Sequence, residues 1–310
     1  MRHDVAMALD PQLKDFLDFV NSTPSMASMT PAEARTAFRT MCVDLRNPDT
    51  LVEVGAIDDD VVEGASGKLA ARVYRPKGET AAPTLALFHG GGFVIGDLDT
   101  HDAMARAICT GADVCVVSVD YRLAPESQYP AAAEDAVAAT EDIKSRLSQF
   151  GGTDLLAVGG DSAGGNLSAV TAQSVPDLAA QFLIYPTVDV HGDYPSRTDN
   201  AKGYFLDMET MAWFINHYAP ALPEDEALSP LRGRFEGLPP AVVLTAEFDP
   251  LRDEGASYAA ALRDAGVSVV HRDYAGMIHG FMDMDMISVA AKAARDDGIA
   301  ELSKLLATLR

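Results

Sequence analysis

Two hydrophobic patterns alternate along most of the chain. Short runs in which almost every residue is apolar, such as 84–88 and 114–119, indicate strands that are buried on both faces. Longer stretches whose apolar residues recur every three or four positions, such as 131–149 and 163–174, indicate helices that bury one side. Strands that alternate with helices predict an α/β fold, in which a mainly parallel sheet carries helices on both faces. Further strands are expected at 51–57, 68–75, 155–159, 180–185, 241–246 and 267–273, and further helices at 100–110, 254–265 and 287–309.

Two segments depart from this alternation. Residues 1–48 read as a helical arm, and residues 187–236 are rich in Pro, Gly and aromatic residues around a single helix near 207–218. The alternating core therefore comprises 49–186 and 237–310. Ligands of such sheets bind at the carboxyl ends of the strands. We expect the arm and the insertion to meet over that edge as a cap.

The chain is strongly acidic. Its 310 residues contain 24 Lys and Arg against 46 Asp and Glu, which gives a formal net charge of −22. Nucleic acids and anionic membranes repel a polyanion, so neither is an expected partner. No apolar stretch approaches the roughly 18 residues of a membrane span. The first twenty residues carry four aspartates rather than the apolar core of a secretory signal, so we expect a cytoplasmic protein.

The cysteines give no sign of a metal or redox centre. Cys42, Cys109 and Cys115 form no Cys-x-x-Cys unit, and none has a histidine at metal-ligand spacing. We interpret them as reduced thiols of an intracellular protein. Neither a metal ion nor an organic cofactor is expected.

The clearest chemical signal is Gly160-Asp-Ser162-Ala-Gly164, which directly follows an apolar run and precedes a predicted helix. A serine at a sharp strand-to-helix turn is held above the sheet in a strained backbone, and the flanking glycines leave room for that turn. Ser162 is therefore the candidate nucleophile. Its neighbour Asp161 is expected to point away from it as a structural residue.

A second signal is His89-Gly-Gly91-Gly92, immediately after the predicted strand 84–88. Consecutive glycines let backbone N–H groups face a cleft, where they can bind the oxyanion of a tetrahedral intermediate. We assign that role to the amides of Gly91, Gly92 and Ala163. An ordinary flexible turn is the alternative for these glycines taken alone.

A serine nucleophile needs a base and an acid that orients the base. His279 follows the last predicted strand and Asp249 follows strand 241–246, so both should lie at the edge where Ser162 emerges. The order Ser, Asp, His is that of α/β-hydrolases. Asp253 and Glu254 open the next helix, where carboxylates favour the helix N-terminus, so they are interpreted as capping residues. The other internal histidines are interpreted as structural or surface residues: His89, His101, His191, His217 and His271.

Taken together, these motifs resemble the bacterial hormone-sensitive-lipase family (family IV) of esterases, in its Gly-Asp-Ser-Ala-Gly subgroup. The resemblance rests on five segments, found at 89–93, 120–126, 160–165, 249–253 and 279–281. It implies an eight-stranded α/β-hydrolase core, a cap made of the N-terminal arm and an insertion, and the same three oxyanion donors. The family assigns no chemistry to 121–126, for which we expect an internal Arg122–Glu126 ion pair.

The resemblance also implies a serine carboxylesterase that acts on short- to medium-chain acyl esters, small molecules, through an acyl-enzyme. An amidase, a peptidase, or a carbamate or lactone hydrolase would use the same triad. A non-catalytic receptor would lack the catalytic histidine, which is present here. Strand 267–273 could pair across a two-fold axis in a homodimer, or remain exposed. Five cap residues are candidates for the wall of a substrate pocket, with the cap's own core as the alternative: Phe205, Met208, Met211, Trp213 and Phe214.

Overall fold

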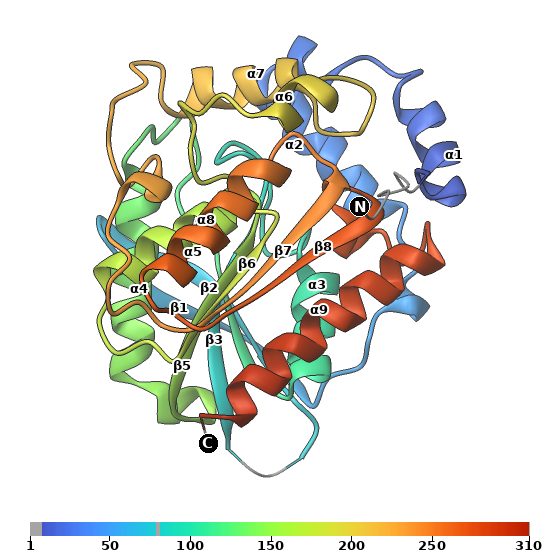
Figure 1. Ribbon diagram of the computed structural model, residues 1–310. Coiled ribbons are helices and arrows are strands. Elements are labelled where there is room, and N and C mark those ends of the chain that lie inside the picture. The colour runs from blue at the N-terminus through green and yellow to red at the C-terminus, as the bar shows by residue number, and fades with distance from the viewer. Residues whose placement is uncertain (1–7, 79–80, 310) are drawn as a thin grey trace, which may run out of the picture.

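The computed structural model describes residues 8–78 and 81–309, and in this part of the chain eight strands form one sheet (Figure 1). The spatial order is β1-β2-β4-β3-β5-β6-β7-β8, and only β2 runs antiparallel to its neighbours. The predicted mainly parallel eight-stranded sheet is confirmed. The strands are β1 Ala56–Gly64, β2 Gly67–Arg75, β3 Ala82–Phe88, β4 Cys115–Val119, β5 Gly152–Asp161, β6 Ala180–Ile184, β7 Ala241–Phe248 and β8 Val269–Ile278.

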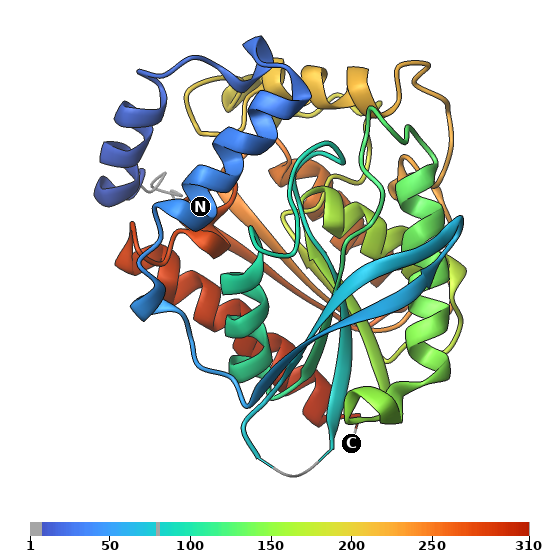
Figure 2. The ribbon, with the colours of Figure 1, turned by 180° about the vertical axis from the view of Figure 1, so that it is seen from behind.

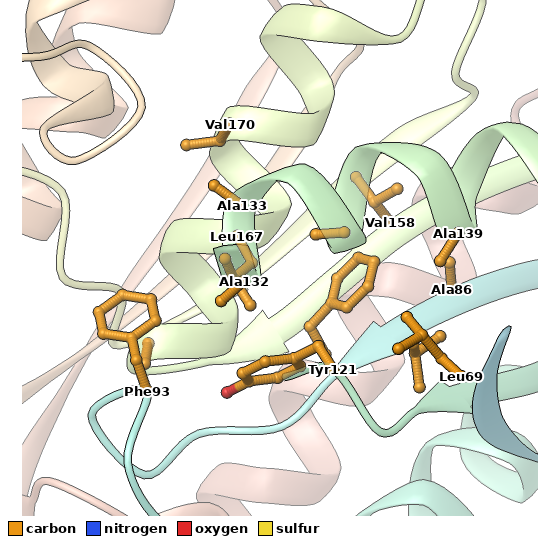
Figure 3. Close-up of a cluster of buried hydrophobic side chains, with 14 of the residues drawn as sticks. Leu69, Ala86, Phe93, Tyr121, Ala132, Ala133, Ala139, Val158, Leu167 and Val170 are labelled. Carbon is orange, nitrogen blue, oxygen red and sulfur yellow. The ribbon is translucent and has the colours of Figure 1, made fainter. Parts of the chain in front are cut away.

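Helices cover both faces of the sheet (Figures 1 and 2). One face packs against α3 Asp102–Ala112 and α9 Val289–Ala307, and the other against α4 Ala131–Ser145, α5 Ala163–Ser174 and α8 Arg252–Asp264. Figure 3 shows how the second face is filled: side chains from the sheet interlock with small and branched side chains of α4 and α5. Because both faces are covered, β3, β4 and β6 are buried along their whole length, which explains their unbroken apolar runs.

A layer of cap elements lies over the carboxyl ends of the strands. It comprises α1 Pro11–Val20 and α2 Pro31–Arg39 from the N-terminal segment, and α6 Pro195–Asp199 and α7 Met208–Tyr218 from the segment between β6 and β7 (Figures 1 and 2). The two segments touch, because the Asn21 amide donates to the Gly203 carbonyl oxygen at 3.2 Å. The short helix α6 was not expected from the sequence, since five residues are too few for a helical hydrophobic pattern.

The first strand lies further along the chain than predicted. Residues 51–55 form no strand, and β1 begins at Ala56. This strand is the outer edge of the sheet, and Val62 is its only buried hydrophobic side chain. Three consecutive aspartates, 58–60, therefore face solvent, and Asp59 pairs across the ladder with Arg72 at 2.9 Å. An exposed acidic edge strand has no apolar run for a pattern to detect.

The expected Arg122–Glu126 ion pair is wrong. Arg122 instead binds Asp135 on α4, with Nε 2.7 Å from one carboxylate oxygen. Glu126 accepts two hydrogen bonds from the guanidinium of Arg35 on α2, each at 2.7 Å. That guanidinium also donates to the carbonyl oxygens of Val94 and Ala124, so the segment 121–126 serves to fasten the N-terminal segment to the core.

Asp253 and Glu254 stand in the first turn of α8, but they do not cap it. Asp253 accepts a hydrogen bond from the backbone N–H of Ser196, at the start of α6. The fully buried Glu254 accepts from the N–H of Val188 at 2.8 Å and pairs with Arg197. Both carboxylates therefore anchor the segment that follows β6, which no local pattern could reveal.

Two adjacent carboxylates on α4, one buried and one exposed, test how much a buried and hydrogen-bonded acid stabilises the fold. Asp135 is fully buried and accepts from the N–H of Ala65 and from Arg122, whereas Glu134 is exposed and lies 3.9 Å from the same arginine. Asp135→Ala removes the buried acceptor of several hydrogen bonds from Ala65 and the partly exposed Arg122, and should lower the free energy of unfolding by about 2 kcal/mol or more. Glu134→Ala should change it by less than about 0.5 kcal/mol. Urea denaturation of both variants measures the difference, and equal effects would contradict the assignment.

Candidate active site

Ser162 occupies a strained turn between β5 and α5. Its φ of +54° is unusual for a residue with a side chain. The turn needs glycine on either side, because a Cβ on Gly160 or Gly164 would overlap the carbonyl oxygen of Phe88 at the end of β3. The strand register thus presses the serine turn against the neighbouring strand and lifts the hydroxyl above the sheet.

The structure brings Ser162, His279 and Asp249 together. The hydroxyl Oγ of Ser162 lies 3.0 Å from Nε2 of His279, and Nδ1 of that ring lies 2.7 Å from a carboxylate oxygen of Asp249. Asp249 follows β7 and is fully buried, and His279 follows β8 with 7% of its surface exposed. A carboxylate at Nδ1 fixes the proton there, so the Nε2 lone pair faces the serine hydroxyl.

Neighbouring groups hold the acid and the base in place. The second carboxylate oxygen of Asp249 accepts from the N–H of Leu251 at 2.8 Å, and the side-chain amide of Asn200 donates to the Asp249 carbonyl at 3.1 Å. The buried ring of Tyr185 lies 4.5 Å from the His279 ring, centroid to centroid. Sequence reasoning missed Asn200 and Tyr185. The only signal was the position of Tyr185 at the end of a predicted strand, beside the serine turn.

The glycine loop presents free amides to this site. Gly91 and Gly92 have φ values of +108° and +59°, and the Gly91 carbonyl accepts from the N–H groups of Val94 and Ile95 at 3.0 Å each. Within residues 8–78 and 81–309, the amides of Gly91, Gly92 and Ala163 have no protein acceptor. These three donors can therefore bind an oxygen that carries negative charge.

His89 supports the loop from within the protein. Its ring stacks on Tyr121 at 4.3 Å between centroids, and the Tyr121 hydroxyl donates to the His89 carbonyl at 2.7 Å. Nδ1 lies 2.7 Å from the Gly90 carbonyl oxygen. Burial, followed by the nearby imidazole of His101, lowers the pKa of His89 to about 4, so the ring stays neutral.

The predicted pocket residues separate into groups. Phe214 lies directly against Gly92, since a Cβ there would overlap its ring, and Phe205 lies beside Gly280. Trp213 is buried within the cap layer, 5.3 Å from the Phe214 ring centroid, and it therefore belongs to the interior of that layer. Met208 and Met211 are half-buried on the same helix. Phe214 thus contacts the glycine loop, and Phe205 contacts the loop that carries His279.

Comparison with known proteins identifies the family. Residues 85–283 match the family model described as alpha/beta hydrolase fold. The chain is 41% identical to carboxylic ester hydrolase LipN of Mycobacterium tuberculosis, over 87% of this chain and 75% of LipN, and 34% identical to ethyl acetate hydrolase of Pseudomonas putida, over 97% and 99%. The chain belongs to the hormone-sensitive-lipase family of carboxylic ester hydrolases, within the α/β-hydrolase superfamily.

Solved structures agree with this family. The crystal structure of a mutant of LAE6, an alpha/beta hydrolase enzyme from the metagenome of Lake Arreo in Spain, superposes with a TM-score of 0.92. It is 37% identical, and the match covers 96% of this chain and 99% of that one. The predicted family and α/β-hydrolase fold are confirmed. Among the described helices of this esterase, none combines the length and the apolar character needed to cross a bilayer.

The contact between Phe214 and Gly92 gives a test. Gly92→Ala places a methyl group against the ring and a side chain at positive φ, so the loop must shift. Loss of an oxyanion donor costs about 100-fold or more in turnover, and we expect such a fall in kcat/KM toward p-nitrophenyl acetate. Phe214→Ala removes the overlap. Gly92→Ala should therefore lower kcat/KM by a smaller factor in the Phe214→Ala background than in the parent enzyme. A Gly92→Ala enzyme with normal kcat/KM would contradict this geometry.

Proposed function

We propose that this esterase hydrolyses short- to medium-chain acyl esters through a Ser162–His279–Asp249 triad and a covalent acyl-enzyme. The observation that carries the proposal is the unbroken chain of contacts from hydroxyl to imidazole to buried carboxylate, at 3.0 Å and 2.7 Å. Nucleophile, base and orienting acid follow three different strands, β5, β8 and β7, whose carboxyl ends meet at one edge of the sheet.

In the proposed acylation step, Nε2 of His279 takes the proton of Ser162 while Oγ attacks the ester carbonyl carbon. The carbonyl oxygen becomes an oxyanion, which accepts hydrogen bonds from the free amides of Gly91, Gly92 and Ala163. The tetrahedral intermediate then collapses and breaks the bond to the leaving oxygen. His279 returns its proton to that oxygen, so the alcohol leaves neutral and Ser162 carries the acyl group.

Deacylation repeats these steps with water. His279 removes a proton from a water molecule, whose oxygen attacks the acyl carbon and regenerates the oxyanion. Collapse releases the carboxylic acid, and Oγ of Ser162 recovers a proton from His279. Asp249 stabilises the imidazolium in both steps because its carboxylate faces Nδ1. Proton and charge are thus returned to the starting state after each turnover.

The cap supports the proposed substrate range. Phe214 lies against the glycine loop and Phe205 lies beside the His279 loop, and we propose that these rings bound the acyl site. A relative that covers almost the whole chain is named for ethyl acetate, whose acyl group is short. We therefore propose acyl chains of about two to eight carbons as the preferred substrates.

Substitutions in the triad test the mechanism. Ser162→Ala removes the nucleophile and should abolish hydrolysis of p-nitrophenyl butyrate and labelling by a fluorophosphonate probe. Asp249→Asn keeps the shape of the side chain but allows the wrong imidazole tautomer, and should lower kcat by about 10⁴-fold. The control is Asp273→Asn on β8, whose carboxylate accepts a hydrogen bond from the Thr245 hydroxyl, and this variant should keep the parent kcat. Retention of more than a trace of activity by Ser162→Ala would reject the proposed nucleophile.

The substrate range is tested by chain-length profiling. We expect kcat/KM for p-nitrophenyl esters, measured from acetate to palmitate, to peak at or below about eight acyl carbons, because Phe205 and Phe214 are proposed to bound the acyl site. Phe214→Ala should shift the maximum toward longer chains if this ring bounds the acyl pocket. A maximum at palmitate in the parent enzyme would refute the proposed preference.

A further inference from the structure

A second His–Asp contact lies behind the glycine loop, apart from the one that orients the base. His101, at the N-terminus of α3, is 2% exposed, and its Nε2 lies 3.5 Å from Oδ1 of Asp161. Asp161 directly precedes Ser162 and is 7% exposed. The proposed mechanism gives neither residue a role.

Asp161 connects the serine turn to the glycine loop. Its Oδ1 accepts a hydrogen bond from the N–H of Gly90 at 2.8 Å. The carboxylate also packs against the Cα of Gly90 so closely that a Cβ there would overlap it. Gly90 immediately precedes the two glycines that present the oxyanion donors. The position of those donors relative to Oγ of Ser162 therefore depends on this carboxylate.

The orientation of His101 is also fixed. The Thr100 hydroxyl donates to the Asp97 carbonyl at 2.9 Å and lies 2.9 Å from Nδ1 of His101. Because its own proton is used, the hydroxyl accepts from Nδ1–H. In the protonated ring the second proton sits on Nε2, where it faces Asp161. The neutral ring instead offers Nε2 to the Gly90 N–H, at a longer 3.3 Å.

Charge balance favours the protonated ring. No lysine or arginine in the described residues pairs with Asp161. Burial opposes ionisation of both partners. The attraction between them, together with the nearby carboxylates on His101 and the Gly90 N–H on Asp161, outweighs it, so the pKa of His101 is raised and that of Asp161 is lowered.

The other ionisable groups that face this pair are mostly neutral or acidic. Asp97 and Asp283 also face His101, and burial raises the pKa of Asp283 to about 6. The neutral His89 ring lies 5.3 Å from the His101 ring, centroid to centroid. The remaining groups near Asp161 have pKa values raised mainly by burial and stay uncharged: Cys42, Tyr121 and Tyr185.

We propose that His101 and Asp161 form a buried ion pair that holds the glycine loop in position against Ser162, and that both act as positioning residues for ester hydrolysis. This inference rests on the proposed function, since it concerns the oxyanion donors of that reaction. The ring contributes a positive charge that lets a carboxylate remain buried beside the nucleophile, and the carboxylate fixes the Gly90 amide. Substrate touches neither side chain.

The pair predicts a pH dependence. It is intact above the lowered pKa of Asp161 and below the raised pKa of His101. As pH rises through the latter, the imidazolium loses its proton and Asp161 is left without a counter-charge. The parent enzyme should therefore show a falling alkaline limb in kcat/KM.

A double-mutant cycle tests the pair. Asp161→Asn and His101→Gln should each lower kcat toward p-nitrophenyl butyrate by about 10–100-fold with KM within about threefold, because the oxyanion donors are displaced. Affinity for phenylboronic acid, whose adduct carries a tetrahedral anion, should fall in parallel with kcat. His101→Gln/Asp161→Asn removes both charges, so its loss should be clearly smaller than the product of the single losses. The double variant should also lack the alkaline limb.

The controls are His271→Gln and Asp273→Asn, a histidine and an aspartate on β8 that share the Thr245 hydroxyl. Both should keep the parent kcat. Circular dichroism and melting temperature show that each variant is folded. Three outcomes would each overturn the proposed ion pair. They are unchanged kcat in the single variants, a loss in the double variant equal to the product of the single losses, and an alkaline limb that persists in the double variant. Failure of the proposed function itself would appear separately, as activity retained by Ser162→Ala.

Discussion

The site depends on one close backbone contact between neighbouring strands. β3 and β5 pair in parallel with Phe88 opposite Gly160, and the Phe88 carbonyl lies where a side chain at position 160 or 164 would have to be. The same strand end continues into His89 and the glycine loop. The register of this one strand pair therefore sets the distance between Ser162, the proposed nucleophile, and the amides of Gly91 and Gly92, the proposed oxyanion donors.

Buried acids organise the rest of the molecule around that contact. Asp135, Asp161, Asp249 and Glu254 are all buried. Three of them accept a backbone N–H from a distant segment, and Asp249 faces Nδ1 of His279. Such groups are costly to bury unless they are fully bonded, so each fixes the relative position of two segments. The chain carries a net charge of −22, and some of its acidic side chains lie in the interior rather than on the surface.

The sequence predicted what is local and missed what is distant. The serine turn, the glycine loop and the positions of Asp249 and His279 follow from motifs placed at strand ends, because a parallel sheet gathers those ends at one edge. The acidic strand β1 escaped because an edge strand needs no apolar run. The partners of Arg122, Glu126 and Glu254 were misjudged for another reason. The close spacing of Arg122 and Glu126 suggested a pair, and the place of Glu254 at a helix start suggested capping, whereas the true partners come from other elements.

The segment that supplies α6 and α7 leaves the core after β6 and returns at β7, two strands that pair directly. Its two ends are therefore held side by side by ladder hydrogen bonds, whatever the length or composition of the chain between them. Loop-closure entropy rises only slowly with added residues. The segment that carries α6 and α7 can consequently change in length and sequence while Ser162, Asp249 and His279 below it keep their spacing.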